Sequence, residues 1–180
     1  MVQAFNTHAL LPPFMGSPTE FKGVSPYPTT MEYVVSRFAS TPQRHAVMAG
    51  FLQFRSALRS LGIVNGLQWL DGSLMENKPE PKDIDVVTFF HIDPENFYLL
   101  LDNHPELFSS QTTKDQYKVD AYFVNLASPD PFETVREITY YYGLFSHQRS
   151  TDRWKGMIEI PLSSLDNDEA ARSLLSARFP

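Results

Sequence analysis

The 180-residue sequence contains no cysteine. It therefore has no disulfide framework, no thiolate nucleophile and no zinc or iron–sulfur site built on cysteine ligands, and it fits a reducing environment. Long apolar runs are also missing, since no window approaches the roughly 18 apolar residues of a membrane span. No lysine or arginine precedes Lys22, so the charged start of a signal peptide is not expected. We expect a cytoplasmic protein without a membrane partner.

Positive charge is in the minority, with 15 Lys and Arg residues against 21 Asp and Glu residues and a formal net charge of −6. This balance argues against a protein that simply coats nucleic acid, although it leaves room for a local basic site. Apolar residues make up 42% of the chain, which favours a folded core over disorder. The length fits one domain, which we place at residues 31–180.

The first thirty residues are expected to form an extended arm that packs on this domain. Proline lacks an amide donor and restricts the residue before it, and the arm carries prolines at positions 12, 13, 18, 26 and 28. Its apolar residues Leu10, Leu11, Phe14 and Tyr27 favour contact with the body of the protein.

Capping signals and periodicity predict mixed α/β secondary structure. Thr41 followed by Pro42 is a helix start, and apolar residues then follow the helical period up to Gly62. Further helices are expected over 31–38, 94–101, 131–145 and 170–177, the last capped by Asp166. Strands are expected over 67–70, 84–90, 117–126 and 154–161. The helix at 131–145 is expected to follow one apolar side, formed by Phe132, Val135, Ile138 or Thr139, and Tyr142.

Two carboxylates stand together at the start of the strand expected over 84–90. Side chains alternate along a strand, so Asp83 and Asp85 project from the same face and repel each other. A divalent cation is the usual compensation, and oxygen ligands without His or Cys favour Mg²⁺ or Mn²⁺ over zinc. Asp120 interrupts a later apolar strand, and all three carboxylates can converge if the two strands are neighbours.

A phosphate-binding turn is predicted at Gly72-Ser73, directly after a strand and separated from Asp83 by nine residues. Glycine permits close approach of a phosphate to the backbone, and the Ser73 hydroxyl can donate to its oxygens. Each part has an ordinary alternative: Asp-x-Asp can be a solvated strand end, Gly-Ser a simple turn, and Asp120 an inward residue bonded to Tyr122 or to an amide. Together, in this order, they favour phosphoryl or nucleotidyl transfer.

In this pattern the sequence resembles the nucleotidyltransferase superfamily that includes DNA polymerase β and the minimal nucleotidyltransferases. Its Gly72-Ser73, the nine-residue spacing, Asp83-Ile-Asp-Val86 and Asp120 match that superfamily, whereas Asp71 departs from the apolar residue expected before the glycine. Several longer segments look like an uncharacterised bacterial family of nucleotidyltransferase-like proteins: Leu11-Pro-Pro, Arg37–Arg44, Gln68–Ser73, Asp83–Phe90, Tyr142–His147 and Trp154–Gly156.

The resemblance implies a small mixed sheet with helices packed mainly on one side. It also implies that Asp83, Asp85 and Asp120 are the catalytic and metal-binding residues, with Asp120 helping to deprotonate the acceptor hydroxyl. Gly72 and Ser73 would hold the β- and γ-phosphates of an NTP. Small relatives in this superfamily often act in toxin–antitoxin or phage-defence modules, which makes that context an expectation here.

A locally positive segment between His147 and Lys155 is a second candidate for contact with an NTP or RNA. It contains Arg149, Arg153 and Lys155, which can clamp phosphates, and Trp154, which can stack on a base. The alternative is a solvated loop after a helix with a buried tryptophan. Lys78 and Lys82, beside the proposed turn, can also reach phosphate or be ordinary loop lysines.

Two functions from different classes follow from these patterns. The first is a Mg²⁺- or Mn²⁺-dependent nucleotidyltransferase that moves a nucleoside monophosphate from an NTP to a hydroxyl of RNA, protein or a small molecule. Because 180 residues leave little room for an acceptor domain, a partner protein or a homodimer is expected to supply specificity. The alternative is a non-catalytic binding module of the same fold that neutralises or scaffolds a partner protein.

Overall fold

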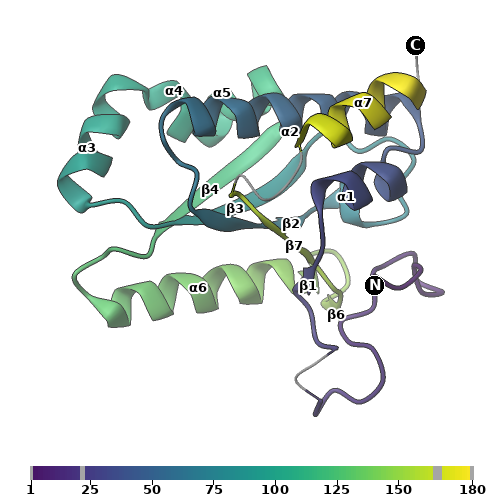
Figure 1. Ribbon diagram of the computed structural model, residues 1–180. Helices are drawn as coiled ribbons and strands as arrows, with labels where there is room; N and C mark the ends of the chain where they lie inside the picture. The colour runs from purple at the N-terminus through teal and green to yellow at the C-terminus, as the bar shows by residue number, and fades with distance from the viewer. Residues whose placement is uncertain (1, 21–22, 164–167, 179–180) are drawn as a thin grey trace.

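The computed structural model describes residues 2–20, 23–163 and 168–178 and contains a five-stranded mixed sheet in the order β1-β7-β2-β3-β4 (Figure 1). The pairs β1–β7 and β3–β4 are parallel, and β7–β2 and β2–β3 are antiparallel. The strands are β1 (Tyr27–Pro28), β2 (Gly66–Asp71), β3 (Ile84–Phe90), β4 (Val119–Asn125) and β7 (Ile158–Pro161). The expected α/β class with a small mixed sheet is confirmed.

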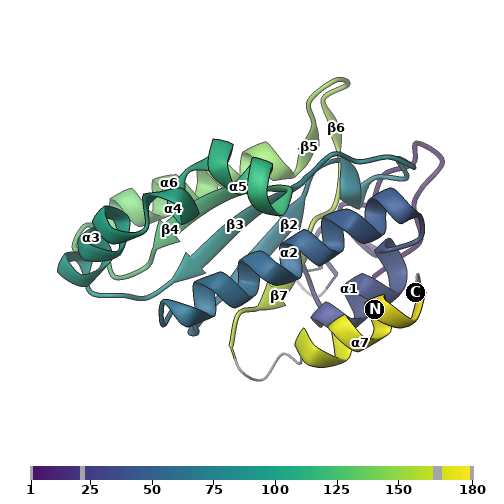
Figure 2. The same ribbon diagram turned by 90° about the horizontal axis from the view of Figure 1, so that it is seen from above.

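Most helices lie on one face of this sheet (Figures 1 and 2). They are α1 (Met31–Phe38), α2 (Pro42–Ser60), α3 (Pro94–Asn103), α4 (Pro105–Phe108), α5 (Ser110–Tyr117) and α7 (Asp168–Arg178). Helix α2 begins as its sequence predicts, because the Thr41 side chain accepts a hydrogen bond from the Arg44 amide at 3.2 Å and Pro42 is the first helical residue. Its fully buried side chains Val47, Phe51, Phe54 and Leu58 form the centre of the main core.

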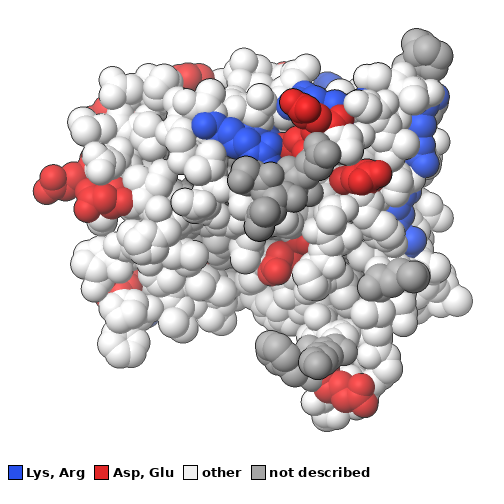
Figure 3. All heavy atoms as spheres, viewed as in Figure 1, with Lys and Arg blue, Asp and Glu red and all other residues white. Residues whose placement is uncertain are grey.

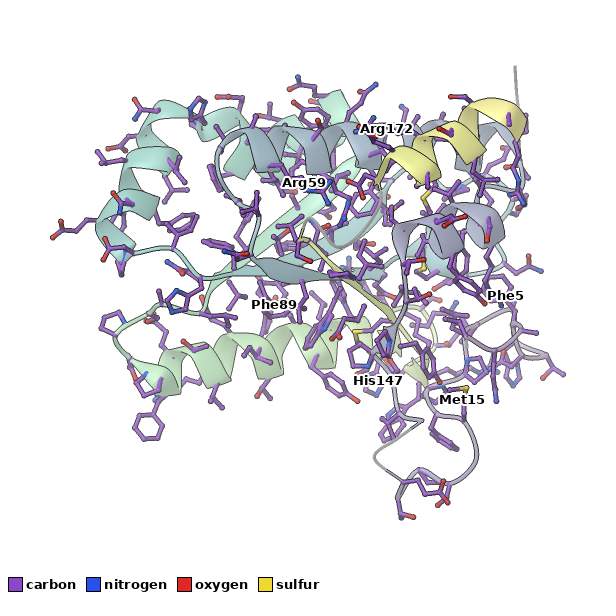
Figure 4. All side chains as sticks on the ribbon, in the orientation of Figure 1. Phe5, Met15, Arg59, Phe89, His147 and Arg172 are labelled. Carbon is purple, nitrogen blue, oxygen red and sulfur yellow. The ribbon has the colours of Figure 1, made fainter. Side chains whose placement is uncertain are left out.

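Helix α6 (Pro131–Phe145) covers the opposite face, and Phe89 points from the sheet toward it (Figure 4). The predicted side of this helix is only partly right: Ile138 packs against the sheet, but Phe132 is 71% exposed, Val135 59% and Tyr142 38%. Phe145 is buried instead, with Ile138, Tyr141 and Leu144 packed against the same small core. Both sides of α6 carry apolar residues at helical spacing, so periodicity alone could not identify the side that meets the sheet.

Several smaller expectations also need correction. Residues 105–117 form α4 and α5, which were not predicted because the sequence of α5 has little apolar periodicity. The strand expected over 154–161 is divided: Arg153–Trp154 (β6) pairs with His147–Gln148 (β5), and β7 belongs to the main sheet. The arm contributes the edge strand β1, and the proposed cap Asp166 lies outside the described residues.

None of the helices in residues 2–20, 23–163 and 168–178 has the length and apolar character that crossing a membrane requires. On the face seen in Figure 3, basic side chains adjoin acidic ones near the top of the view, and other acidic side chains lie in small groups apart from them.

Candidate functional site

Three aspartates form a row across three neighbouring strands. Asp71 ends β2 and lies opposite Asp85 of β3, and Asp85 lies opposite Asp120 of β4 in the parallel pair. The sequence-based condition that the strands of Asp85 and Asp120 be neighbours is therefore met. Asp83 stands two residues before Asp85, immediately outside β3. Sheet register, rather than a single loop, places these acids together.

A cleft of about 460 Å³ lies beside this row. Of the residues predicted for the site, the cleft is lined by Gly72, Ser73, Asp83, Asp85, Asp120, Arg149 and Lys155. Lys82 and Arg153 are exposed and are not among its lining residues. Trp154 is also exposed and meets the His147 ring edge-on at 5.8 Å. The structure thus brings together most, but not all, of the predicted residues.

Gly72 cannot be replaced without disturbing the row of acids. Its φ is +83°, in the region that favours glycine, and an added Cβ would lie 2.0 Å from Asp85 Oδ2. The turn then continues into the short helix η1 (Ser73–Met75), which places Ser73 on the edge of the cleft. The glycine therefore lets the β2 turn pass directly against the carboxylate of β3.

Asp85 is held in an environment that disfavours its charge. Burial, followed by the charges of Asp120 and Asp83, raises the pKa of Asp85 to about 6 from 3.8. The Arg149 guanidinium approaches Asp85 Oδ1 at 4.0 Å, and Arg149 itself is two-thirds exposed. A further positive charge bound beside Asp85 would therefore stabilise its ionised form.

Four polar residues that line the cleft, Asp71, Glu76, Gln148 and Lys155, contact one another. Lys155 Nζ lies 2.9 Å from Asp71 Oδ2 and 3.4 Å from Glu76 Oε1. Gln148 Nε2 donates to Glu76 Oε2 at 3.3 Å, so the β5–β6 hairpin is tied to the turn after β2. Burial raises the pKa of Asp71 to about 7, although the Lys155 ammonium acts in the opposite direction. The other oxygen, Asp71 Oδ1, is buried without a hydrogen-bond partner among the described residues.

Asp120 is bonded by two side chains of α5. Ser110 Oγ donates to Asp120 Oδ1 at 2.5 Å, and Lys114 Nζ lies 2.6 Å from Asp120 Oδ2. Burial raises the pKa of Asp120, but hydrogen bonds from Lys114, Ser110 and Tyr122 outweigh it, and the resulting pKa lies below the usual value. Asp85 and Asp120 thus differ in their protonation chemistry although they are neighbours in register.

The loop that carries Glu76 and Lys78 is organised by a buried arginine of α2. Arg44 donates to the carbonyl oxygens of Phe38, Leu74, Glu76 and Lys78. Burial lowers the pKa of Arg44 to about 10, which still leaves it charged at neutral pH. The first turn of α2 therefore sets the shape of one wall of the cleft.

The donor chemistry of the cleft fits a hard divalent cation, because carboxylate oxygens are the ligands that Mg²⁺ and Mn²⁺ prefer. Within residues 2–20, 23–163 and 168–178, however, no group of three or more His, Asp or Glu side chains is arranged to hold a metal ion. Asp120 and Asp71 are instead paired with the ammonium groups of Lys114 and Lys155. The carboxylates of the cleft therefore have the right chemistry for a divalent cation, but two of them, Asp120 and Asp71, already pair with Lys114 and Lys155.

The sequence alone did not identify several residues of the cleft: Asp71, Glu76, Lys114 and Gln148. Asp71 had a signal, since an acid that ends an apolar strand beside Gly72 is costly to bury unless it is used or paired. No sequence signal identifies Lys114, because the helix that carries it is not predicted.

Comparison with known families places the chain in one of them. Residues 3–161 match the family described as a family of unknown function, DUF6932, and the protein belongs to it. The matched range contains every residue that lines the cleft. No curated protein matches the chain, and no solved structure matches it.

Proposed function

We propose that the protein is a Mg²⁺- or Mn²⁺-dependent nucleotidyltransferase that moves a nucleoside monophosphate from an NTP to a hydroxyl group. The observation that carries this proposal is the register of Asp85 and Asp120 on adjacent parallel strands, with Gly72 packed directly against Asp85. The resemblance of Gly72-Ser73, Asp83-x-Asp85 and Asp120 to the nucleotidyltransferase pattern supports the same reaction.

In this proposal Asp83, Asp85 and Asp120 hold the metal, which when bound supplies positive charge to the triphosphate. The acceptor oxygen forms a bond to the α-phosphorus, the bond from that phosphorus to the bridging oxygen of the β-phosphate breaks, and pyrophosphate leaves with the bonding electrons. Asp120 accepts the proton of the hydroxyl, the role that the resemblance implies for this position.

The basic residues divide into two groups by their burial. Arg149 is largely exposed at the mouth of the cleft and Lys78 lines it, so both are placed to meet the phosphates of an NTP. Lys155 is only 5% exposed and is paired with Asp71 and Glu76. We therefore assign Lys155 to supporting the site, instead of the direct phosphate contact expected from the sequence.

The acceptor remains a hydroxyl of RNA, a protein or a small molecule. Because the candidate cleft has a volume of only about 460 Å³, we expect a partner protein or a second copy of the chain to help select the acceptor. A role in a toxin–antitoxin or phage-defence module rests on the resemblance alone.

A non-catalytic binding module is the second candidate, and two observations favour it. Helix α6 exposes Phe132, Val135 and Tyr140, an apolar side suited to protein contact. Asp120 is already satisfied by Lys114 and Ser110. A module of this kind would keep the fold and bind a partner without turning over an NTP.

The two functions are separated by a transfer assay on the full chain. The purified protein is incubated with each α-labelled NTP, with Mg²⁺ or Mn²⁺, and with pooled tRNA or cell lysate as the source of acceptors. The proposal predicts metal-dependent label on a macromolecule or small molecule together with release of pyrophosphate. No transfer and no NTP binding under any of these conditions would leave the binding module as the better account.

A further inference from the structure

Lys114 stands where its ammonium group meets the row of acids. Its Nζ lies 2.6 Å from Asp120 Oδ2, and the side chain lines the same cleft as Asp83 and Asp85. Asp120 is 6% exposed, whereas Lys114 is 36% exposed. The carboxylate is therefore fixed and enclosed, and the lysine reaches it from the open side.

The backbone that carries Lys114 is held firmly in place. At Gly50 of α2, an added Cβ would lie 2.1 Å from the carbonyl oxygen of Tyr117, so α2 and the end of α5 are in close contact. Lys118 then ends α5 in a left-handed conformation with φ of +58°, and its amide donates to the Lys114 carbonyl at 3.0 Å. Movement at this site is thus expected in the long side chain of Lys114, with the helix itself staying in place.

The electrostatic field at the Lys114 ammonium group comes from the three predicted metal ligands, Asp83, Asp85 and Asp120. The hydrogen bond to Asp120, together with the charges of Asp120, Asp83 and Asp85, raises the pKa of Lys114. Lys114 is a full positive charge at neutral pH, and its charge faces the same acids that a divalent cation needs. One lysine cannot remain at Asp120 Oδ2 while a metal ion uses that oxygen, because the two cations repel each other.

We propose that Lys114 is an internal counter-ion that competes with the divalent cation for the three aspartates and, when the metal binds, turns to the anionic ligand in the same cleft. The inference rests on the proposed function, since it takes Asp83, Asp85 and Asp120 as the metal ligands. It assigns a positioning role to a residue that neither the sequence pattern nor the resemblance marks.

This arrangement couples the binding of the divalent cation to the binding of the triphosphate. Metal alone must break the charge-assisted hydrogen bond between Lys114 and Asp120, so it binds weakly. When a triphosphate is present, the displaced ammonium gains a new partner, and each ligand strengthens the binding of the other by the same factor. Lys114 therefore weakens metal binding by the three aspartates when no NTP is bound.

The test is a Mn²⁺ titration at low salt, followed by electron paramagnetic resonance of the free ion, on the full chain without nucleotide. Lys114→Met and Lys114→Gln are expected to bind Mn²⁺ roughly tenfold more tightly than the wild type, because no charge-assisted hydrogen bond has to be broken first. Lys114→Arg keeps the charge and is expected to bind weakly, as the wild type does. Lys118→Met is the matched control, since it removes the same charge from an exposed residue at the end of the same helix.

A second titration in the presence of an α,β-methylene NTP analogue measures the coupling. The wild type is expected to gain more Mn²⁺ affinity from the analogue than Lys114→Met does. Equal Mn²⁺ affinity in the wild type and in both neutral variants would overturn the role of Lys114 and leave the metal site standing. Absence of Mn²⁺ binding in every variant, with and without the analogue, would overturn both the counter-ion and the metal-dependent function.

Discussion

Lys155 and Asp71 form an ion pair at 2.9 Å in which both side chains are almost fully buried, at 5% and 6% exposure. The pair joins the end of β2 to the segment that follows the β5–β6 hairpin. It therefore holds Arg149, which lies on that hairpin, near Asp85. The geometry of the cleft depends on this buried contact as much as on the row of acids.

Removing one partner of the pair is expected to be strongly destabilising. Lys155→Met leaves Asp71 buried without its cation, and we expect the free energy of unfolding to fall by about 3–5 kcal/mol in urea titrations at pH 7.5. The double variant Asp71→Asn/Lys155→Met removes the stranded charge and is expected to recover part of the loss. A Lys155→Met protein as stable as the wild type would show that the pair is not formed.

Arg44 is expected to be needed for the loop that carries Glu76 and Lys78. Arg44→Met withdraws hydrogen bonds from four carbonyl oxygens, and we expect a loss of roughly 2–4 kcal/mol, with faster proteolysis in the loop. The control is Arg136→Met on the exposed surface of α6, which is expected to change stability by less than about 0.5 kcal/mol. Equal protease sensitivity of the two variants would contradict this assignment.

Two glycines provide a matched test of the β2 turn. Gly72→Ala places a Cβ against Asp85 Oδ2 at a positive φ, so we expect a loss of about 1–3 kcal/mol and loss of Mn²⁺ binding. Nothing lies within 4 Å of a Cβ added at Gly143 in α6, and Gly143→Ala is expected to stabilise the protein by about 0.5–1 kcal/mol. Unaltered Mn²⁺ binding in Gly72→Ala would separate the turn from the metal site.

The raised pKa of Asp85 predicts a specific dependence of stability on pH. The pKa of its carboxyl group rises from an ordinary value of 3.8 to about 6 in the folded chain, so the folded state binds more protons between these values. The contribution of Asp85 to stability is therefore fully present below about pH 4 and is lost as the pH rises through 6.

Asp85→Asn removes this titration, and at pH 7.5 it is expected to be more stable than the wild type by about 1–3 kcal/mol. The difference should shrink as unfolding is measured at successively lower pH down to 4. A constant difference across that range would show that Asp85 is not held in a disfavoured charged state.

How far the sequence predicts this structure differs from one element to another. The strand at 84–90 was predicted with its observed bounds because a β-branched and aromatic run between loops has few alternatives. Helix α5 was missed because Ser110–Tyr117 is almost entirely polar and is stabilised by packing on β4 and α2 that no local pattern reports.

The sequence predicts the acidic residues of the candidate site better than it predicts the basic residues that pair with them. Asp83, Asp85 and Asp120 follow from spacing within strands, whereas the partners Lys114 and Lys155 follow from which helix and hairpin pack over the sheet. Asp71 was treated as a departure from the pattern, although sheet register makes it the neighbour of Asp85. Register between distant strands is set by the whole core, so single-sequence reasoning could not supply it.

The central claim is that the row of acids supports nucleotidyl transfer, and Asp85 tests it most directly. Pyrophosphate release and label transfer from an α-labelled NTP are measured with Mg²⁺ or Mn²⁺ for the wild type and for Asp85→Asn, which preserves shape and removes the charge. The account predicts metal-dependent transfer by the wild type and at least a hundredfold reduction in Asp85→Asn, on the order of 3 kcal/mol of transition-state stabilisation. Transfer at an equal rate by both proteins, or by neither, would contradict it.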